Sequence, residues 1–187
     1  MSMALADYIV HLPAALPGAF CEAVLAEYRD AGDWMAAQVE SDGERRAVRD
    51  TDMVPLSERS VIARNRAVRQ QLDETLVRHT AEVLRLYHQR FPRCQVGRDS
   101  GFELLRYRTG GFYRQHTDSF HRAPRELACS FVLNDGYEGG AFAFFDRART
   151  YTLARGDALL FPANFMYPHE VLPVTSGTRY AIVTWFV

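Results

Sequence analysis

The spacing of apolar residues divides the chain into a helical first half and a strand-rich second half. Phe20, Val24, Tyr28 and Met35 recur at intervals close to the helical repeat. Pro17 precedes them, at a point where the first turn of a helix tolerates proline. We therefore expect the first helix to begin near residue 17.

A second, longer helix is predicted from about residue 57 to residue 90, and Pro92 closes it. Five apolar positions fall on one face of its second half: Val68, Leu72, Leu76, Val83 and Tyr87. This face is expected to pack against the rest of the molecule.

Between the two helices, residues 41–55 carry mixed charges and show no apolar period. This pattern predicts a loop or a short pair of strands. The charged stretch from Glu44 to Asp52 permits two interpretations, a lid that recognises substrate or an ordinary connecting segment.

After Gly101 the helical spacing gives way to short aliphatic and aromatic runs, which Gly, Asp, Asn and Pro interrupt. The runs cover residues 102–107, 127–133, 141–145, 158–161 and 180–187. Helices followed by many short strands are typical of an α+β domain, here a double-sheet barrel braced by N-terminal helices. We expect one domain over residues 1–187, with residues 1–95 mainly helical support and residues 101–187 the core.

Composition and charge exclude several classes of protein. The 22 basic and 23 acidic side chains give a formal net charge of -1, which predicts neither a nucleic-acid partner nor a membrane surface. Cys21, Cys94 and Cys129 are scattered and form no C-x-x-C pair, as is typical of a reducing compartment. Without a signal-peptide pattern or an apolar run of about 20 residues, the chain is expected to be soluble and cytoplasmic.

The candidate chemistry lies in the strand half, at His116, Asp118 and His169. Alternate residues of a strand share a face, so His116 and Asp118 are expected to point the same way. Pro168 holds the backbone before His169 extended. Two imidazoles and one carboxylate are the facial ligand set of non-haem Fe(II) oxygenases, although His-x-Asp alone also fits a satisfied ion pair on a surface strand.

Arg179 adds a fourth candidate, because it stands in a run of mostly apolar residues from 177 to 185. A buried guanidinium requires an anion, and its planar fork suits a carboxylate. Together with the three metal-ligand candidates, Arg179 predicts an oxygenase that uses Fe(II) and 2-oxoglutarate.

The same residues resemble a known family. The pattern Tyr-x-x-Gly-x-x-Tyr-x-x-His-x-Asp, from Tyr107 to Asp118, resembles the prolyl-4-hydroxylase branch of the Fe(II)/2-oxoglutarate oxygenases. Residues 125–134 and 137–140 resemble it too, and residues 169–185 are similar to the hypoxia-sensing prolyl hydroxylases. The resemblance extends over about residues 101–187.

This resemblance implies a double-stranded β-helix, or jelly roll, and the cofactors Fe(II), 2-oxoglutarate and O2, with ascorbate as a reductant. It makes His116, Asp118 and His169 the iron ligands. It places the distal carboxylate of 2-oxoglutarate on Arg179, with Tyr107 as a hydrogen-bond partner. The oxygen sensors have a Tyr where this chain has Val132. The contact between a Tyr hydroxyl and the co-substrate is therefore missing here, or Tyr107 or Thr178 makes it instead.

The substrate is less sharply defined than the reaction. The resemblance favours a prolyl residue in a protein or peptide, and a free amino acid or small natural-product intermediate is the alternative. Two other classes stay open, a Zn-dependent hydrolase or isomerase and a non-catalytic jelly-roll binding module. Two aromatic residues have two possible positions each. Tyr113 is expected either to line the pocket or to lie in the core, and Trp185 either to lie near the site or to pack in the core without a role there. The sequence does not predict the oligomeric state.

Overall fold

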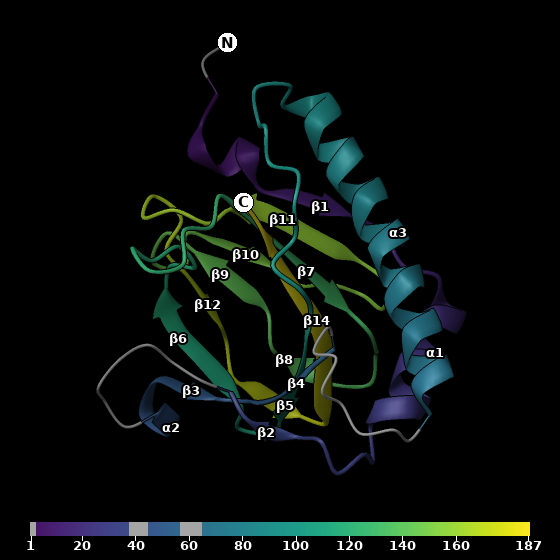
Figure 1. The fold of residues 1–187 in the computed structure, drawn as a ribbon. Helices are drawn as coiled ribbons and strands as arrows, with labels where there is room; N and C mark the ends of the chain where they lie inside the picture. The colour runs from purple at the N-terminus through teal and green to yellow at the C-terminus, as the bar shows by residue number, and fades with distance from the viewer. Residues whose placement is uncertain (1–2, 38–44, 57–64) are drawn as a thin grey trace.

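The computed structural model describes residues 3–37, 45–56 and 65–187. Two antiparallel sheets face each other and form a jelly roll (Figure 1). The larger sheet contains, in spatial order, β1 (Val10–Leu12), β11 (Ala158–Pro162), β7 (Leu127–Val132), β14 (Thr178–Phe186), β5 (Glu103–Arg108), β4 (Asp52–Pro55) and β2 (Met35–Ala36). The smaller sheet contains β10 (Arg149–Tyr151), β9 (Phe142–Phe144), β12 (His169–Val171), β6 (Phe112–His116) and β3 (Arg49–Asp50). A short pair, β13 (Val174–Ser176) with β8 (Glu138–Gly139), lies apart from both.

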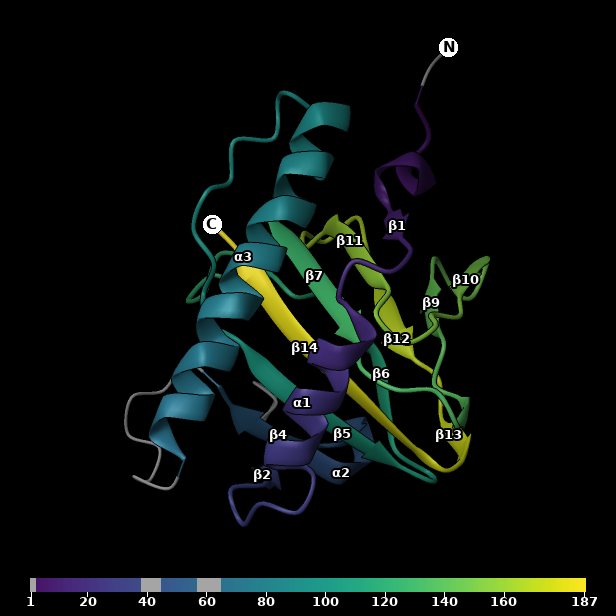
Figure 2. The same cartoon turned by 90° about the vertical axis from the view of Figure 1, so that its right-hand side faces the viewer.

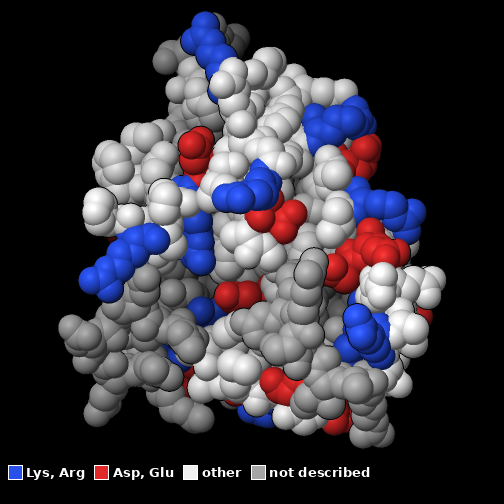
Figure 3. Space-filling view, in the orientation of Figure 1, with Lys and Arg blue, Asp and Glu red and all other residues white. Residues whose placement is uncertain are grey.

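Two helices, α1 (Gly18–Tyr28) and α3 (Arg66–Arg90), cover the outer face of the larger sheet (Figure 2). A 3-10 helix, η1 (Leu5–Tyr8), precedes β1, and the short α2 (Arg45–Val48) precedes β3. Within the described residues, no helix combines the length and the apolar character needed to cross a membrane. Basic and acidic side chains alternate over the face shown in Figure 3, in keeping with the near-zero net charge.

Both predicted helices are present, but their positions differ in part from the prediction. α1 ends at Tyr28, and Met35 lies exposed on β2, so the helical pattern does not extend to Met35. α3 ends as predicted before Pro92, but Val68 is exposed rather than on the packed face. The predicted start of this helix, at residues 57–64, lies outside the described residues.

All five predicted strand runs of the second half form strands, namely β5, β7, β9, β11 and β14. The first half supplies strands as well, because β1, β2 and β4 extend the larger sheet and β3 extends the smaller one. The prediction of a mainly helical first half was therefore incomplete. These strands are two to four residues long, too short for a period-2 pattern to stand out.

The segment predicted as a loop or strand pair, residues 41–55, is structured where it is described. Residues 45–55 contain α2, β3 and β4, but β3 pairs with β6 while β4 pairs with β2 and β5. The two strands are therefore not partners of each other. Met53 and Val54 are buried, although the sequence of residues 41–55 shows no apolar period that would predict this. Residues 41–44 of the suggested lid lie outside the described residues.

Alternation along β14 separates two apolar clusters. Tyr180, Ile182 and Phe186 pack toward the helices, whereas Val183 and Trp185 face the space between the sheets. On this inner side β14 carries Arg179 and Val183. A nine-residue strand thus joins the helix-packed core to the interior of the jelly roll.

Candidate functional site

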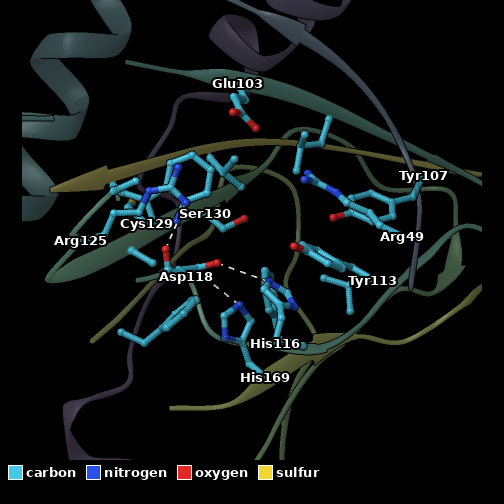
Figure 4. Close-up of a pocket in the computed structure, with 18 of the residues that line it drawn as sticks. Arg49, Glu103, Tyr107, Tyr113, His116, Asp118, Arg125, Cys129, Ser130 and His169 are labelled. Atoms are coloured by element: carbon cyan, nitrogen blue, oxygen red, sulfur yellow. Dashed lines mark hydrogen bonds and ion pairs between the residues drawn. The ribbon is translucent and has the colours of Figure 1, made fainter. Parts of the chain in front are cut away.

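Three potential metal ligands meet between the sheets, at His116, Asp118 and His169 (Figure 4). Their ligand atoms lie within 4.8 Å of one another. His116 Nε2 is 3.3 Å from Asp118 Oδ1, and His169 Nε2 is 3.6 Å from Asp118 Oδ2. Adjacent ligands of an octahedral ion with bonds near 2.1 Å are about 3 Å apart. The cluster therefore has the size that one metal ion requires.

Asp118 reaches the cluster from a turn rather than from the strand. β6 ends at His116, and the backbone N–H groups of Asp118 and Ser119 both donate to the carbonyl oxygen of Ala163, at 3.2 and 3.0 Å. The expectation that His116 and Asp118 share one strand face was wrong in this detail. The turn, fixed by the end of β11, brings the carboxylate to the same place.

Backbone carbonyls orient both imidazoles. His116 Nδ1 lies 2.8 Å from the carbonyl oxygen of Arg114, and His169 Nδ1 lies 3.1 Å from that of Tyr167. Because a carbonyl only accepts, we assign the ring proton to Nδ1 in each case. Each Nε2 then presents a lone pair toward Asp118, which is how metal-binding histidines are held.

The surroundings keep the cluster in the charge state that binds cations. Burial lowers the pKa of His169 to about 4, although Asp118 opposes this shift, so the imidazole is neutral near pH 7. Burial alone would raise the pKa of Asp118, but His169, His116 and a hydrogen bond from Trp185 hold it well below its usual range. One carboxylate and two imidazole nitrogens form a donor set that suits Fe(II).

Trp185 and Arg125 support Asp118 from the other side. The Trp185 side chain hydrogen-bonds to the carboxylate of Asp118. The Arg125 guanidinium lies 3.7 Å from the centroid of the Trp185 ring and donates to the backbone carbonyl of Asp118 at 3.1 Å. Of the two roles left open for Trp185, the structure therefore places it at the site.

Tyr113 also faces the cavity, because β6 contains one extra residue relative to β12. His116 pairs with His169 and Tyr113 with Val171, so three steps on β6 oppose two on β12. This bulge puts Tyr113 and His116 on one face, and their rings stack with centroids 3.5 Å apart. Burial raises the pKa of Tyr113 to about 12, so it is a neutral phenol at physiological pH.

A cavity of about 250 Å³ contains the cluster and extends to Arg179. Arg179 is 1% exposed, and among the described residues its Nε and Nη2 atoms have no hydrogen-bond partner. Its guanidinium carbon lies 5.2 Å from the ring centroid of Tyr107 and 5.3 Å from that of Phe142. A buried, unneutralised guanidinium is costly, so this end of the cavity fits an anionic ligand.

Of the two other residues predicted to bind the co-substrate, Tyr107 lines the cavity and Thr178 does not. Tyr107 is directly opposite Arg179 in the sheet and lines the cavity. Thr178 does not line it, and alternation along β14 turns its side chain to the other face. Thr178 is therefore not part of the candidate site.

Four polar residues of the cavity were missed in the sequence, namely Arg49, Glu103, Arg125 and Ser130. The sequence could have indicated two of them. Glu103 lies four positions before Tyr107 on a strand, hence on the same face, and Ser130 is a polar residue within the otherwise apolar β7. Arg49 carried none, because β3 is only two residues long.

The family model of the 2OG-Fe(II) oxygenase superfamily matches residues 102–187, which include the three ligand candidates and Arg179. This part of the chain is therefore similar to that superfamily. The name of the superfamily implies Fe(II), 2-oxoglutarate and O2. The site fits these groups, since one cavity offers a two-histidine, one-carboxylate donor set and a buried guanidinium whose Nε and Nη2 atoms have no hydrogen-bond partner among the described residues.

Individual relatives and solved structures are similar to this chain as well. A PKHD-type hydroxylase of Idiomarina loihiensis is 33% identical over 88 residues, which is 44% of this chain and 39% of that protein. One of Beijerinckia indica is 28% identical over 95% of this chain and 77% of its own length. A prolyl hydroxylase of Trichoplax adhaerens, solved with a peptide of hypoxia inducible factor, has a TM-score of 0.77 at 18% identity, covering 96% of this chain and 83% of that one. The match to the Idiomarina relative thus spans about two fifths of that protein, and the Trichoplax structure shows the fold alone.

Proposed function

We propose that the protein is an Fe(II)- and 2-oxoglutarate-dependent dioxygenase that hydroxylates an unactivated C–H bond. Its metal ligands are His116, Asp118 and His169. The observation that carries the proposal is Arg179, whose guanidinium is buried in the same cavity as the three ligands and whose Nε and Nη2 atoms have no hydrogen-bond partner among the described residues. A metal cluster alone would suit many reactions, but a buried cation beside it calls for a carboxylate co-substrate.

Each residue has a part that follows from its position. The two imidazoles and the Asp118 carboxylate hold the metal, and Trp185 and Arg125 keep Asp118 in place. Arg179 binds the distal carboxylate of 2-oxoglutarate, with Tyr107 beside it. The apolar walls at Phe142, Phe161 and Val183 exclude water around these charges.

When bound, Fe(II) supplies the redox chemistry in which 2-oxoglutarate, O2 and a C–H bond become succinate, CO2 and an alcohol. One oxygen atom enters succinate and the other the product, so no further oxidant is needed. No side chain has to act as a general acid or base. Ascorbate as a reductant and a cytoplasmic location are parts of the same proposal.

For the substrate we propose a prolyl residue in a protein or peptide. Support comes from the name of the Trichoplax enzyme, a prolyl hydroxylase solved with a peptide, while the PKHD-type relatives are named as hydroxylases without a substrate. A free amino acid or small natural-product intermediate is the second candidate, because a cavity of about 250 Å³ also suits a small molecule.

The test is anaerobic titration of 2-oxoglutarate into the Fe(II)-loaded protein, followed by exposure to O2. We expect a visible absorption band on titration and then formation of succinate. His169→Ala is the metal-site control and should show neither, whereas His88→Ala should behave like the parent. A protein that binds the metal but gives no band and no succinate would contradict the proposal and favour the zinc hydrolase or the binding module.

A further inference from the structure

The inner face of the larger sheet carries a row of three side chains at the end of the cavity away from Arg179. Ser130 on β7 pairs with Val183 on β14, which in turn pairs with Glu103 on β5. Neighbouring strands are about 4.8 Å apart, so the α-carbons of Ser130 and Glu103 are about 10 Å apart across Val183. The row lies four residues along β14 from Arg179, which is about 13 Å.

Both polar members of this row have open hydrogen-bonding capacity. Ser130 is 2% exposed, and its hydroxyl has no hydrogen-bond partner among the described residues. Glu103 interacts electrostatically with Arg49, Arg125 and Asp118, and among the described residues its carboxylate has no hydrogen-bond partner. A buried hydroxyl and a half-buried carboxylate thus offer acceptor oxygens to a ligand.

The neighbouring arginines are, by contrast, engaged with the protein. Arg49 is buried, and its guanidinium carbon lies 4.5 Å from the centroid of the Tyr113 ring. Arg125 packs on Trp185 and donates to the carbonyl of Asp118. Their charges remain, but an aromatic ring covers a face of each guanidinium, and Arg125 also donates to a backbone carbonyl, so Glu103 is the more open charged group.

Glu103 also stands on the way into the cavity. An outer groove of about 460 Å³ shares Arg49, Glu103, Arg125 and Trp185 with the inner cavity. These four residues form a neck between the two spaces. The outer groove is otherwise lined largely by apolar side chains, among them Met35, Met53 and Phe102. Figure 4 shows Glu103 across the cavity from His116, Asp118 and His169.

The chemistry of this row favours a cationic donor. Burial raises the pKa of Glu103, and Arg49 and Arg125 oppose this only in part. A desolvated carboxylate gains most from a partner that brings opposite charge and an N–H group together. A protonated amine has at least two N–H donors, one for the carboxylate and one for the Ser130 hydroxyl, so it satisfies both acceptors.

We propose that Glu103 and Ser130 form a subsite that receives a protonated amino group of the substrate and directs a neighbouring C–H bond toward the metal cluster. This rests on the proposed dioxygenase function and narrows its substrate class. The amino group has two sources, the α-amino group of a free amino acid or the side chain of a lysine beside the target residue in a peptide.

The experiment compares charged and uncharged versions of the same probe. Free L-amino acids, proline included, are matched with their N-acetyl derivatives, and proline-containing peptides with Lys beside proline are matched with norleucine versions. The measurement is substrate-stimulated succinate formation by the Fe(II)-loaded enzyme. Glu103→Gln and Ser130→Ala are the test variants. Glu138→Gln, at an exposed position on β8, is the control.

We expect at least one cationic probe to stimulate the enzyme and its uncharged partner to fail. Glu103→Gln should raise the half-saturating concentration of that probe at least about tenfold, and Ser130→Ala a few-fold. Glu138→Gln should leave it unchanged. The 2-oxoglutarate absorption band and the thermal unfolding midpoint should be the same in all variants, which excludes misfolding as the cause. Whether the amino acids or the peptides respond identifies the source.

Three results would overturn the subsite. They are equal stimulation by charged and uncharged probes, an unchanged half-saturating concentration in Glu103→Gln, and no response to any cationic probe. In all three cases an intact 2-oxoglutarate band with slow uncoupled succinate formation would leave the dioxygenase function standing. A parent protein without the band or succinate would instead overturn the function and the subsite together.

Discussion

Arg179 is the largest side chain that the described fold buries completely, and its unpaired nitrogens make it the most informative single residue. Arg179→Ala removes a charge-assisted contact from a desolvated site. We expect 2-oxoglutarate affinity to fall by ~2–5 kcal/mol. Anaerobic titration of the absorption band measures this directly.

Arg106→Ala is the matched control, because Arg106 is paired with Asp52 and does not line the cavity. It should leave 2-oxoglutarate affinity nearly unchanged. Equal affinity in Arg179→Ala and the parent would mean that Arg179 is structural and that the co-substrate binds elsewhere.

His169 should make the stability of the metal-free protein depend on pH, and the direction of that dependence can be stated. The pKa of His169 is lowered by burial from 6.5 to about 4, so the unfolded chain binds a proton that the native state excludes. Stability should therefore fall as the pH drops from about 6.5 to about 4, with a contribution approaching 1.4 kcal/mol per pH unit. Urea unfolding of the metal-free protein across this range measures the slope.

His169→Gln should remove that contribution and flatten the slope, whereas His121→Gln, at an exposed position, should not. An unchanged slope in His169→Gln would show that the buried imidazole is not the group that titrates.

At the scale of elements, a glycine turn makes room for the Arg179 side chain. Gly140 has φ +65, and a β-carbon there would lie 2.8 Å from Arg179 Cδ and 3.2 Å from Val174 Cγ2. Gly140→Ala should push Arg179 out of place and weaken 2-oxoglutarate binding by about tenfold or more, the scale of one disturbed charge-assisted contact. The measurement is again the anaerobic titration.

Gly136 provides a control with similar strain and no contact. It has φ +81, and a β-carbon there would meet nothing within 4 Å. Both alanine variants should lose ~1–2 kcal/mol of stability from the left-handed backbone, but only Gly140→Ala should lose 2-oxoglutarate affinity. Loss of affinity in both would point to a general effect of destabilisation.

Elements with a long or chemically marked pattern were predictable from the sequence. Short aliphatic and aromatic runs predicted β5 and β14, and an arginine in a mostly apolar run predicted a guanidinium buried in the strand half. The bulge in β6 and the turn that carries Asp118 were not predictable, because both depend on strands that pair from distant parts of the chain. Arg49 was missed because its strand, β3, is only two residues long and therefore has no period.

At the scale of the whole molecule, the helices and the site lie on opposite faces of one sheet. α1 and α3 pack on the outer face, through residues such as Phe20, Leu76 and Tyr87. Arg179, Ser130 and Glu103 project from the inner face. The helices therefore stabilise the sheet that positions the site without touching the ligands.

This arrangement predicts that stability and ligand binding can be separated. Leu76 is 1% exposed on α3, and Leu76→Ala should cost ~2–5 kcal/mol by leaving a cavity between helix and sheet. Its neighbour Val77 is 42% exposed, so Val77→Ala should change the free energy of unfolding by no more than about 0.5 kcal/mol. At low temperature, where both variants are folded, 2-oxoglutarate should bind as in the parent. Weakened binding in folded Leu76→Ala would contradict this and show that the helix sets the position of Arg179 through the sheet.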